Sequence, residues 1–297
     1  ETVDQCWGAS SMQVSAAWQL SKSARPTLVA VLDTGIDTDN PHLALRTDDD
    51  ILLSGATGTN DVCGHGTHVA STIAAIAPNC SLLNVKVIDD RGFCTSEHVA
   101  RGIRLAVDRG AAVINLSLEV TPSSELEAAV SYAWERGAVI VAAAGMPRVA
   151  GPVSRFLGDV PEDSTGLLPL RNQPAYPASY PEVIAVTGTT ETGGVAPASN
   201  RAPWVDVAAP GYRTFADLPG GHGFLSGTSC AAAHVSGLAA LLCGLAHDTN
   251  GNSLINDEVR LAIESTATPL HLEGTGSGLV NALAAVASLS TPTDLLS

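Results

Sequence analysis

The sequence predicts an α/β fold in which a mostly parallel central sheet is covered by helices on both faces. Apolar runs and helical segments alternate in the order β-α-β-α-β-α-β between residues 27 and 145, and parallel strands need such crossover helices. Aromatic residues make up only 4% of the chain, so the core is built from Ala, Val, Leu and Ile. Those side chains allow helices to pack closely on a sheet.

The predicted strands are continuous apolar runs, as expected for strands buried on both faces. They are TLVAVLDTGID (27–37), SLLNVKVI (81–88), AAVINLSL (111–118) and AVIVAAAG (138–145), and the strand pattern resumes in YPASYPEVIAVTG (176–188). Asp33, Ser117 and Gly145 lie at the C-terminal ends of three of these runs. Sites in parallel sheets lie outside those ends, so we expect the three residues to border the functional site.

The predicted helices are small-residue or amphipathic segments with start and stop signals. They cover residues 65–76, 96–110, 123–137, 227–246, about 257–266 and about 279–288. In the second of them Ser96 is the expected N-cap and Gly110 the stop. Residues 147–174 hold five prolines and three glycines and are expected to be an inserted surface loop. Without a repeat or linker, residues 1–297 are predicted to form one domain.

Composition narrows the classes of partner and compartment. The net charge of −15 argues against nucleic acid, which requires clustered Lys and Arg. No apolar run approaches the roughly 20 residues of a membrane span, and ETVDQCWGAS lacks the charged start and apolar stretch of a signal peptide. The even number of six cysteines hints at an oxidising compartment. We therefore expect a secreted or extracytoplasmic protein, and a monomer.

Three polar residues stand beside glycines in otherwise apolar segments: Asp33, His65 and Ser229. A hydroxyl needs a base to become a nucleophile, an imidazole is such a base near neutral pH, and a carboxylate can orient the imidazole. Each residue also has a plainer interpretation, as a turn aspartate, a helix-start histidine or an N-cap serine. Spacing alone does not bring the three together.

The segments around these residues resemble the signature blocks of the subtilisin-like serine proteases, or subtilases. AVLDTGID, GHGTHVAS and GTSCAAAHVSG follow that family's chain order of Asp, His and Ser. MQVSAAW, VINLSL, YPASYPEVIAV, VDVAAPG and GLVNALAAV are similar to its flanking segments, so the resemblance covers nearly the whole chain apart from residues 147–174. The resemblance implies a three-layer subtilisin-like fold and a serine endopeptidase.

The resemblance also implies roles for individual residues. Ser229 would be the nucleophile, His65 the general base and acid, and Asp33 the residue that orients His65. Substrate backbone would pair with Ser117, Leu118 and Glu119 by strand addition. Ala143, Ala144 and Gly145 would wall the pocket for the residue before the cleaved bond. The implied partners are a peptide or protein substrate and an inhibitory N-terminal propeptide.

Met146 departs from the family pattern, which places Asn directly after AAAG. That Asn donates a hydrogen bond to the oxyanion, whereas a thioether cannot donate. Loss of one such donor costs roughly 10²–10³ in turnover, a magnitude established on subtilisin itself. The Ser229 backbone N–H would remain. Three interpretations stay open. Residues 147–174 contribute another hydrogen-bond donor, for which Asn172 is the candidate, or the enzyme works with a weakened oxyanion hole. In the third, the protein is a weak or inactive protease that binds peptides.

Other departures leave further alternatives open. Glu119 and Val120 stand where the family commonly has Gly-Gly, and the Glu119 carboxylate either favours Arg or Lys in the substrate or is a solvated strand-end charge. A transpeptidase or macrocyclase would use the same acyl-enzyme. The resemblance also implies disulfides Cys63–Cys94 and Cys6–Cys80, whereas Cys230 and Cys243 are expected to be buried free thiols.

No metal or other cofactor is predicted. Asp248–Glu258, DTNGNSLINDE, has oxygen ligands at alternate positions, as calcium loops of the EF-hand type do. However, Ser253 stands at the glycine position and Val259 at the last carboxylate position, so a turn leading into the next helix is favoured over a calcium site. His65 and His68 in HGTH lack the glutamate that would accompany a zinc pair.

Overall fold

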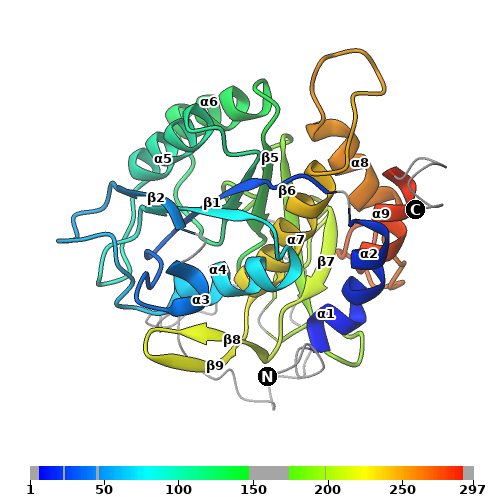
Figure 1. Cartoon of the computed structure of the whole chain (residues 1–297), viewed down its shortest axis with the longest axis horizontal. Coiled ribbons are helices and arrows are strands. Elements are labelled where there is room, and N and C mark those ends of the chain that lie inside the picture. The colour runs from blue at the N-terminus through cyan, green and yellow to red at the C-terminus, as the bar shows by residue number, and fades with distance from the viewer. Residues whose placement is uncertain (1–6, 23, 45–46, 147–173, 198, 290–297) are drawn as a thin grey trace.

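The computed structural model describes residues 7–22, 24–44, 47–146, 174–197 and 199–289 (Figure 1). The predicted loop insertion lies outside these residues except for its last residue, and so do Asn172 and Cys6. The side chains of residue 44 and residues 47–49 are likewise not described. All structural statements below concern the described residues.

The centre of the fold is a seven-stranded sheet in the order β2-β3-β1-β4-β5-β6-β7, in which every neighbouring pair is parallel. An antiparallel hairpin, β8 and β9, stands apart from it. The strands are β1 (Leu28–Asp33), β2 (Thr47–Leu52), β3 (Ser81–Lys86), β4 (Val113–Leu116), β5 (Val139–Ala143), β6 (Val183–Thr189), β7 (Val207–Pro210), β8 (Thr214–Leu218) and β9 (Gly221–Leu225). The mostly parallel sheet predicted from the alternating pattern is confirmed.

Helices cover both faces of this sheet (Figure 1). One face carries α5 (Ser96–Asp108) and α6 (Ser124–Trp134), which pack against each other. The other face carries α4 (His65–Ile76) and α7 (Thr228–Cys243), with α2 (Val14–Leu20), α8 (Asn256–Ser265) and α9 (Ala282–Leu289) beside them. Two short helices, α1 (Trp7–Ser11) and α3 (Pro41–Ala44), complete the described part.

Side-chain alternation along β1 determines on which face its last residue lies. Val29 and Val31 belong to the core under α4 and α7, whereas Ala30 and Leu32 belong to the core under α5 and α6. Successive side chains of a strand point to opposite faces, so Asp33 falls on the face of α4 and α7. The carboxylate of Asp33 therefore lies on the same face of the sheet as α4, which begins with His65, and α7, which contains Ser229.

Several details differ from the sequence prediction. Thr95 rather than Ser96 caps α5, because its side chain accepts the His98 N–H at 3.2 Å, while the Ser96 hydroxyl donates to the Thr121 carbonyl oxygen. The predicted set of elements also omitted α1, α2, α3, β2, β7 and the β8–β9 hairpin. These are short elements, and several lack the long apolar runs that marked the central strands.

The predicted Cys63–Cys94 disulfide is wrong. Both thiols are free, and the Cys63 thiol lies 3.4 Å from the Asp90 carbonyl oxygen, to which it donates. The Cys6–Cys80 pairing involves a residue outside the described part of the chain. Cys230 and Cys243 are buried free thiols, as expected, and burial raises their pKa values to about 11 and about 12. The described cysteines thus no longer point to an oxidising compartment.

Candidate active site

Asp33, His65 and Ser229 gather at the C-terminal edge of the sheet. Asp33 is the last residue of β1, His65 opens α4, and Ser229 lies in the first turn of α7. The Asp33 Oδ1 and His65 Nδ1 atoms are 2.7 Å apart. The Ser229 hydroxyl donates to the Ser117 carbonyl oxygen at 3.2 Å. Ser117 directly follows β4, and β4 is the strand next to β1. The fold therefore assembles the three residues that spacing could not connect.

The Asp33–His65 pair is almost completely shielded from solvent. Asp33 is 0% exposed and His65 is 5% exposed, and Asp33 Oδ1 also accepts the Thr34 N–H at 2.7 Å. Burial lowers the pKa of His65, but the charge and hydrogen bond of Asp33 together with the charge of Asp61 raise it by more, and the net direction is upward from 6.5. The Asp33 carboxylate thus stabilises the imidazolium form and fixes which ring nitrogen carries the inner proton.

Asp61 holds the N-terminus of α4 in place, and the sequence analysis did not single it out. Its Oδ1 accepts the Gly64 N–H and the Thr34 hydroxyl, both at 2.9 Å. Its Oδ2 accepts the Thr67 N–H at 2.9 Å and the Thr67 hydroxyl at 2.6 Å. A carboxylate at this end satisfies N–H groups that have no partner within the helix and complements the helix dipole. These bonds set the position from which His65 faces Asp33.

A buried lysine supports the same corner of the site. Lys86, at the end of β3, is 0% exposed, and its ammonium group pairs with Asp90 at 2.9 Å. It also donates to the carbonyl oxygens of Thr34 and, at 3.2 Å, of Asn60. A buried charge requires such compensation. The signal in the sequence was a single charged residue inside the apolar run LLNVKVI, which predicts a buried polar contact without identifying the partner.

The Ser229 backbone is tied to β4 by reciprocal bonds. The Ser117 hydroxyl donates to the Ser229 carbonyl oxygen at 3.0 Å, while the Ser229 hydroxyl donates to the Ser117 carbonyl oxygen. Asn115 donates to the Ser117 hydroxyl oxygen at 3.0 Å and accepts from the Ser236 hydroxyl at 2.9 Å. The buried network positions the start of α7 against the strand end. It includes Asn115, a polar residue inside the apolar strand β4 that was not predicted to have a role.

Gly145 and its neighbours follow β5 and lie at the site beside the end of β4. The Gly145 N–H donates to the Thr228 hydroxyl oxygen at 3.0 Å, and its carbonyl oxygen accepts the Asn200 N–H at 3.0 Å. Asn200 also donates its side-chain amide to the Ala144 carbonyl oxygen at 2.6 Å. Gly145 has a φ of 79°, a conformation that favours glycine. Met146 follows it with 46% of its surface exposed.

Glu119 lies across from Gly145. A Cβ atom on Gly145 would stand 2.8 Å from a carboxylate oxygen of Glu119. Leu118, between Ser117 and Glu119, is buried in the core under α5 and α6. Because side chains alternate along an extended strand, Ser117 and Glu119 point to the opposite face, which is the Ser229 side. The structure therefore brings the predicted segments 117–119 and 143–145 together.

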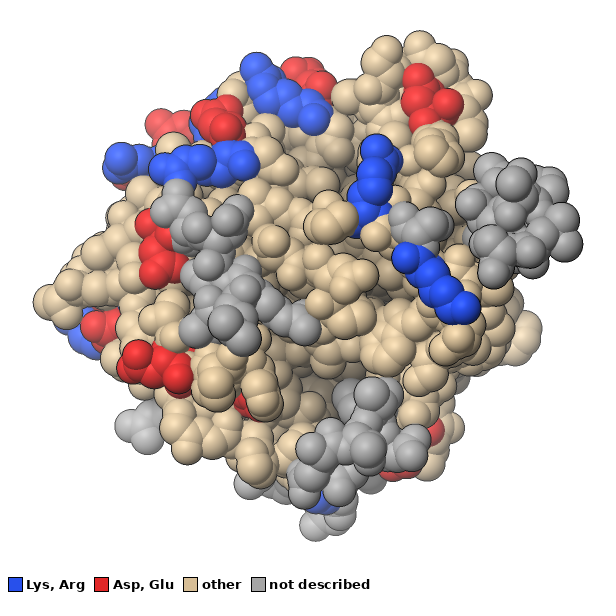
Figure 2. Space-filling model, viewed as in Figure 1, with Lys and Arg blue, Asp and Glu red and all other residues tan. Residues whose placement is uncertain are grey.

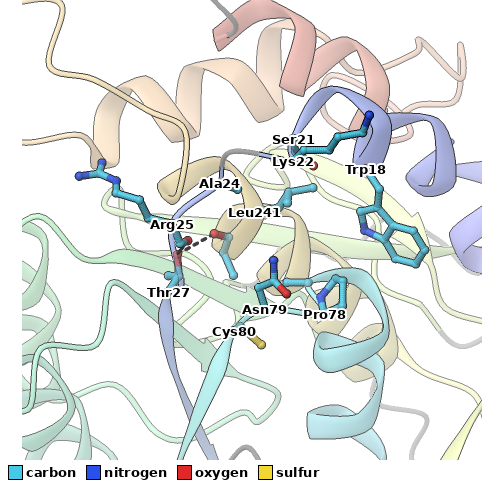
Figure 3. Close-up of a pocket in the computed structure, with 12 residues that line it drawn as sticks. Trp18, Ser21, Lys22, Ala24, Arg25, Thr27, Pro78, Asn79, Cys80 and Leu241 are labelled. Atoms are coloured by element: carbon cyan, nitrogen blue, oxygen red, sulfur yellow. Dashed lines mark hydrogen bonds between the residues drawn. The ribbon is translucent and has the colours of Figure 1, made fainter. Parts of the chain in front are cut away.

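A cavity of about 230 Å³ lies at the other end of the sheet (Figure 3). Its lining includes Trp18, Thr27, Cys80 and Leu241. Thr27 and Cys80 precede β1 and β3, so the cavity borders the N-terminal ends of strands whose C-terminal ends carry the site. Its residues therefore cannot contact the groups around Ser229.

The described residues offer no ready metal centre, since no group of three or more His, Cys, Asp and Glu side chains is placed to hold an ion. In the segment Asp248–Glu258, the Asp248 carboxylate accepts the Gly251 N–H at 2.7 Å and the Ser253 N–H at 2.8 Å. The segment forms the expected turn and leads into α8. Val259 is fully buried in the core at the position of the last EF-hand carboxylate.

The surface matches the acidic composition. On the face shown in Figure 2, the Lys and Arg side chains form no continuous basic stripe: those at the upper left lie among Asp and Glu, and two others lie apart from them. Within the described part of the chain, no helix has both the length and the apolar character required to cross a bilayer.

Comparison with known proteins decides the family. The family model described as the Subtilase family matches residues 24–283. This chain belongs to the subtilase family. It is 36% identical over 296 residues to Thermitase of Thermoactinomyces vulgaris, covering 94% of this chain and 95% of the relative. It is also 36% identical to Subtilisin Savinase of Lederbergia lenta over 291 residues, covering 94% of this chain and 97% of the relative.

A third relative is Subtilisin E of Bacillus subtilis (strain 168), 35% identical over 291 residues that cover 94% of this chain and 70% of the relative. The subtilase described here is accordingly a serine endopeptidase of the subtilisin type, and its sheet and helix layers are those that the resemblance implied.

Proposed function

We propose that this subtilase hydrolyses internal peptide bonds through an acyl-enzyme on Ser229, with His65 as proton acceptor and donor and Asp33 as the residue that orients His65. The observation that carries the proposal is the buried 2.7 Å contact between Asp33 and His65 on the same sheet edge as Ser229. Asp33 holds His65 Nδ1, which leaves Nε2 available to take the hydroxyl proton.

In the first half of the reaction, the Ser229 hydroxyl exchanges its bond to the Ser117 carbonyl for one to His65 Nε2. Its oxygen attacks the substrate carbonyl carbon while its proton passes to His65. The tetrahedral intermediate collapses when His65 returns the proton to the leaving amine. A water molecule then repeats the sequence on the acyl-enzyme, which releases the carboxylic acid and restores the Ser229 hydroxyl.

The strand ends around Ser229 provide the substrate channel in this proposal. Ser117, Leu118 and Glu119 would pair with substrate backbone as an added strand. Ala143, Ala144 and Gly145 would wall the pocket for the residue before the cleaved bond. These roles are supported by the positions of the two segments, which lie side by side at the ends of the paired strands β4 and β5 and beside the N-terminus of α7.

The oxyanion would be stabilised by the Ser229 N–H and the N-terminus of α7, where backbone N–H groups lack intrahelical acceptors. Met146 follows Gly145 where the family carries a donating Asn, and its thioether has no proton to donate. We therefore place the turnover of this subtilase below that of relatives with the Asn. Asn172, the alternative donor, lies outside the described residues. The same feature supports the second candidate, a weak or inactive subtilase that binds peptides.

A serine-directed fluorophosphonate probe tests the proposal directly. We expect the purified protein to be labelled at Ser229 and to cleave an unstructured protein substrate, and Ser229→Ala to abolish both. Mass spectrometry of the labelled peptide identifies the site. Ser226→Ala serves as a matched control, because this nearby hydroxyl accepts the Arg213 N–H and has no role in the mechanism. An unlabelled, inactive wild-type protein of intact fold would instead support the peptide-binding alternative.

A further inference from the structure

Beside the reaction centre, a carboxylate occupies the space between the two strand ends. Glu119 is half-buried, and one of its oxygens lies 2.8 Å from the point where a Cβ on Gly145 would stand. Leu116 of β4 pairs with Ala142 of β5. Continuing this register by three residues places Glu119 opposite Gly145. The strand pairing therefore places the backbone of Glu119 opposite Gly145.

The segment that carries Glu119 is fixed at both ends. On one side, Ser117 exchanges two hydrogen bonds with Ser229, at 3.0 and 3.2 Å. On the other side, the Val120 N–H donates to the Tyr176 carbonyl oxygen at 2.9 Å. Leu118 is anchored in the core between them. The backbone of Glu119 therefore has a defined position relative to the nucleophile.

The opposite wall is equally fixed and leaves room for the carboxylate. The Gly145 N–H is bonded to the Thr228 side chain and its carbonyl oxygen to the Asn200 N–H. A side chain at Gly145 would force the Glu119 carboxylate to move, because a Cβ atom there would stand 2.8 Å from one of its oxygens. The glycine that the strand end requires therefore also accommodates the carboxylate.

We propose that Glu119 selects substrates with a positively charged side chain, Arg or Lys, at the residue before the cleaved bond. Glu119 follows Ser117 by two positions, which in an extended strand is about 7 Å, a span that a long basic side chain covers. The side chain of the residue whose carbonyl Ser229 attacks projects into the space between segments 117–119 and 143–145. A half-buried carboxylate there attracts a cation more strongly than it would in bulk water. Arg can also form two parallel hydrogen bonds with it.

This inference rests on the proposed function, because it concerns the pocket of the same reaction. Its test uses internally quenched peptides of one sequence that differ only at the residue before the cleaved bond: Arg, Lys, citrulline, Leu, Glu or Ala. Citrulline has nearly the shape of Arg without its charge. We expect kcat/KM for Arg to exceed that for citrulline by about 10- to 100-fold, the range expected for a charge-assisted hydrogen bond. Mass spectrometry verifies the cleavage position.

The variant Glu119→Gln removes the charge with little change of shape. We expect it to bring the Arg-to-citrulline ratio close to one. The ratio is taken within one enzyme, so a general change in the rate of the variant cancels from it. Glu119→Lys is expected to invert the preference towards Glu. The exposed turn residue Glu191 provides the control, because Glu191→Gln makes the same chemical change away from the site and should leave the ratio unaltered.

The outcomes separate this inference from the proposed function. If Ser229 is labelled and peptides are cleaved, but wild type does not distinguish Arg from citrulline, the inference is overturned and the proposed function stands. A preference for Ala that Glu119→Gly widens to Leu would also overturn it, because Glu119 would then act by filling the pocket. If Ser229 is neither labelled nor required for cleavage, the proposed function fails and the inference falls with it. The wild-type ratio remains decisive even if a variant fails to fold.

Discussion

The two halves of the candidate reaction centre are built differently. The acid–base half, Asp33 and His65, is buried on regular elements and braced by Asp61 and Lys86. The proposed oxyanion half lies at the end of β5, where the backbone of Gly145 is held at both its N–H and its carbonyl oxygen but the next side chain, Met146, is 46% exposed. Proton transfer depends on fixed distances between side chains, and the first half provides them. In the proposed oxyanion half, Met146 stands where the family resemblance places a donating Asn, so we expect substitutions there to be able to raise activity.

The largest expected loss of activity comes from a substitution in the acid–base half. Asp33→Asn keeps the size of the side chain but removes the charge that orients and stabilises protonated His65, so we expect kcat to fall by about 10⁴. Steady-state kinetics on a quenched peptide measure the loss, with far-ultraviolet circular dichroism to verify the fold. Asp39→Asn, an exposed carboxylate outside the site, is the control. A loss smaller than tenfold would contradict the role given to Asp33.

The pH dependence of kcat/KM in the wild-type enzyme tests the interaction between Asp33 and His65. In the proposed mechanism His65 must be neutral to accept the Ser229 proton, and the Asp33 and Asp61 carboxylates raise its pKa above 6.5 despite its burial. We therefore expect kcat/KM to be low in acid and to rise with pH through a midpoint above 6.5. Initial rates between pH 5 and 9 at constant ionic strength provide the midpoint. A midpoint below 6.5 would mean that burial outweighs the carboxylates.

A substitution in the oxyanion half is expected to raise activity, whereas the substitution in the acid–base half lowers it. Met146→Asn introduces a side-chain amide that can donate to the oxyanion, and we expect kcat to rise by roughly 10²-fold, the lower end of the loss established for this donor in subtilisin. Met146→Leu is the matched control, because it has a similar volume and no donor. An unchanged or lower kcat for Met146→Asn would indicate that another residue already occupies the donor position.

The smallest expected effect concerns stability rather than activity. His68 and His234 are fully buried on α4 and α7, and each donates one ring N–H to a carbonyl oxygen, of Thr214 and Cys230 respectively. Within the described residues, the other ring nitrogen of each has no hydrogen-bond partner. Burial lowers both pKa values to about 4. Protonating either ring would place a charge in the solvent-shielded interior.

A depressed histidine pKa makes the unfolded state bind more protons than the folded state between pH 4 and pH 6.5. The contribution to stability is fully present above pH 6.5 and is lost as the pH falls to about 4, by roughly 3 kcal/mol for each residue. Urea unfolding in the Ser229→Ala background, which prevents self-digestion, measures this loss.

The control for that measurement replaces each histidine by an amide that retains its one donor, His68→Gln and His234→Asn. The double variant should show a flatter dependence of unfolding free energy on pH between 4 and 6.5. An unchanged slope would assign the acid sensitivity to carboxylates instead.

The sequence by itself determined the layered α/β fold, because long buried strands and crossover helices leave strong periodic signals in regions such as 81–118. The α4 bounds, His65–Ile76, agree with the prediction because a glycine precedes the helix and small residues fill it. Thr95 was missed as a cap because two neighbouring residues could both serve, and the choice depends on the direction of the incoming chain. The Cys63–Cys94 bridge was wrongly expected because a resemblance carries no information on thiol geometry.

Tertiary structure alone decided which polar residues meet. Asp33 and His65 are 32 positions apart, and Ser117 and Ser229 are 112 apart, so only the pairing of β1 with β4 and the packing of α4 and α7 bring their atoms into contact. The opposition of Glu119 and Gly145 is likewise a consequence of the β4–β5 register. The sequence specifies the apolar pattern that selects the fold, whereas distances between distant polar groups exist only once the strands have paired.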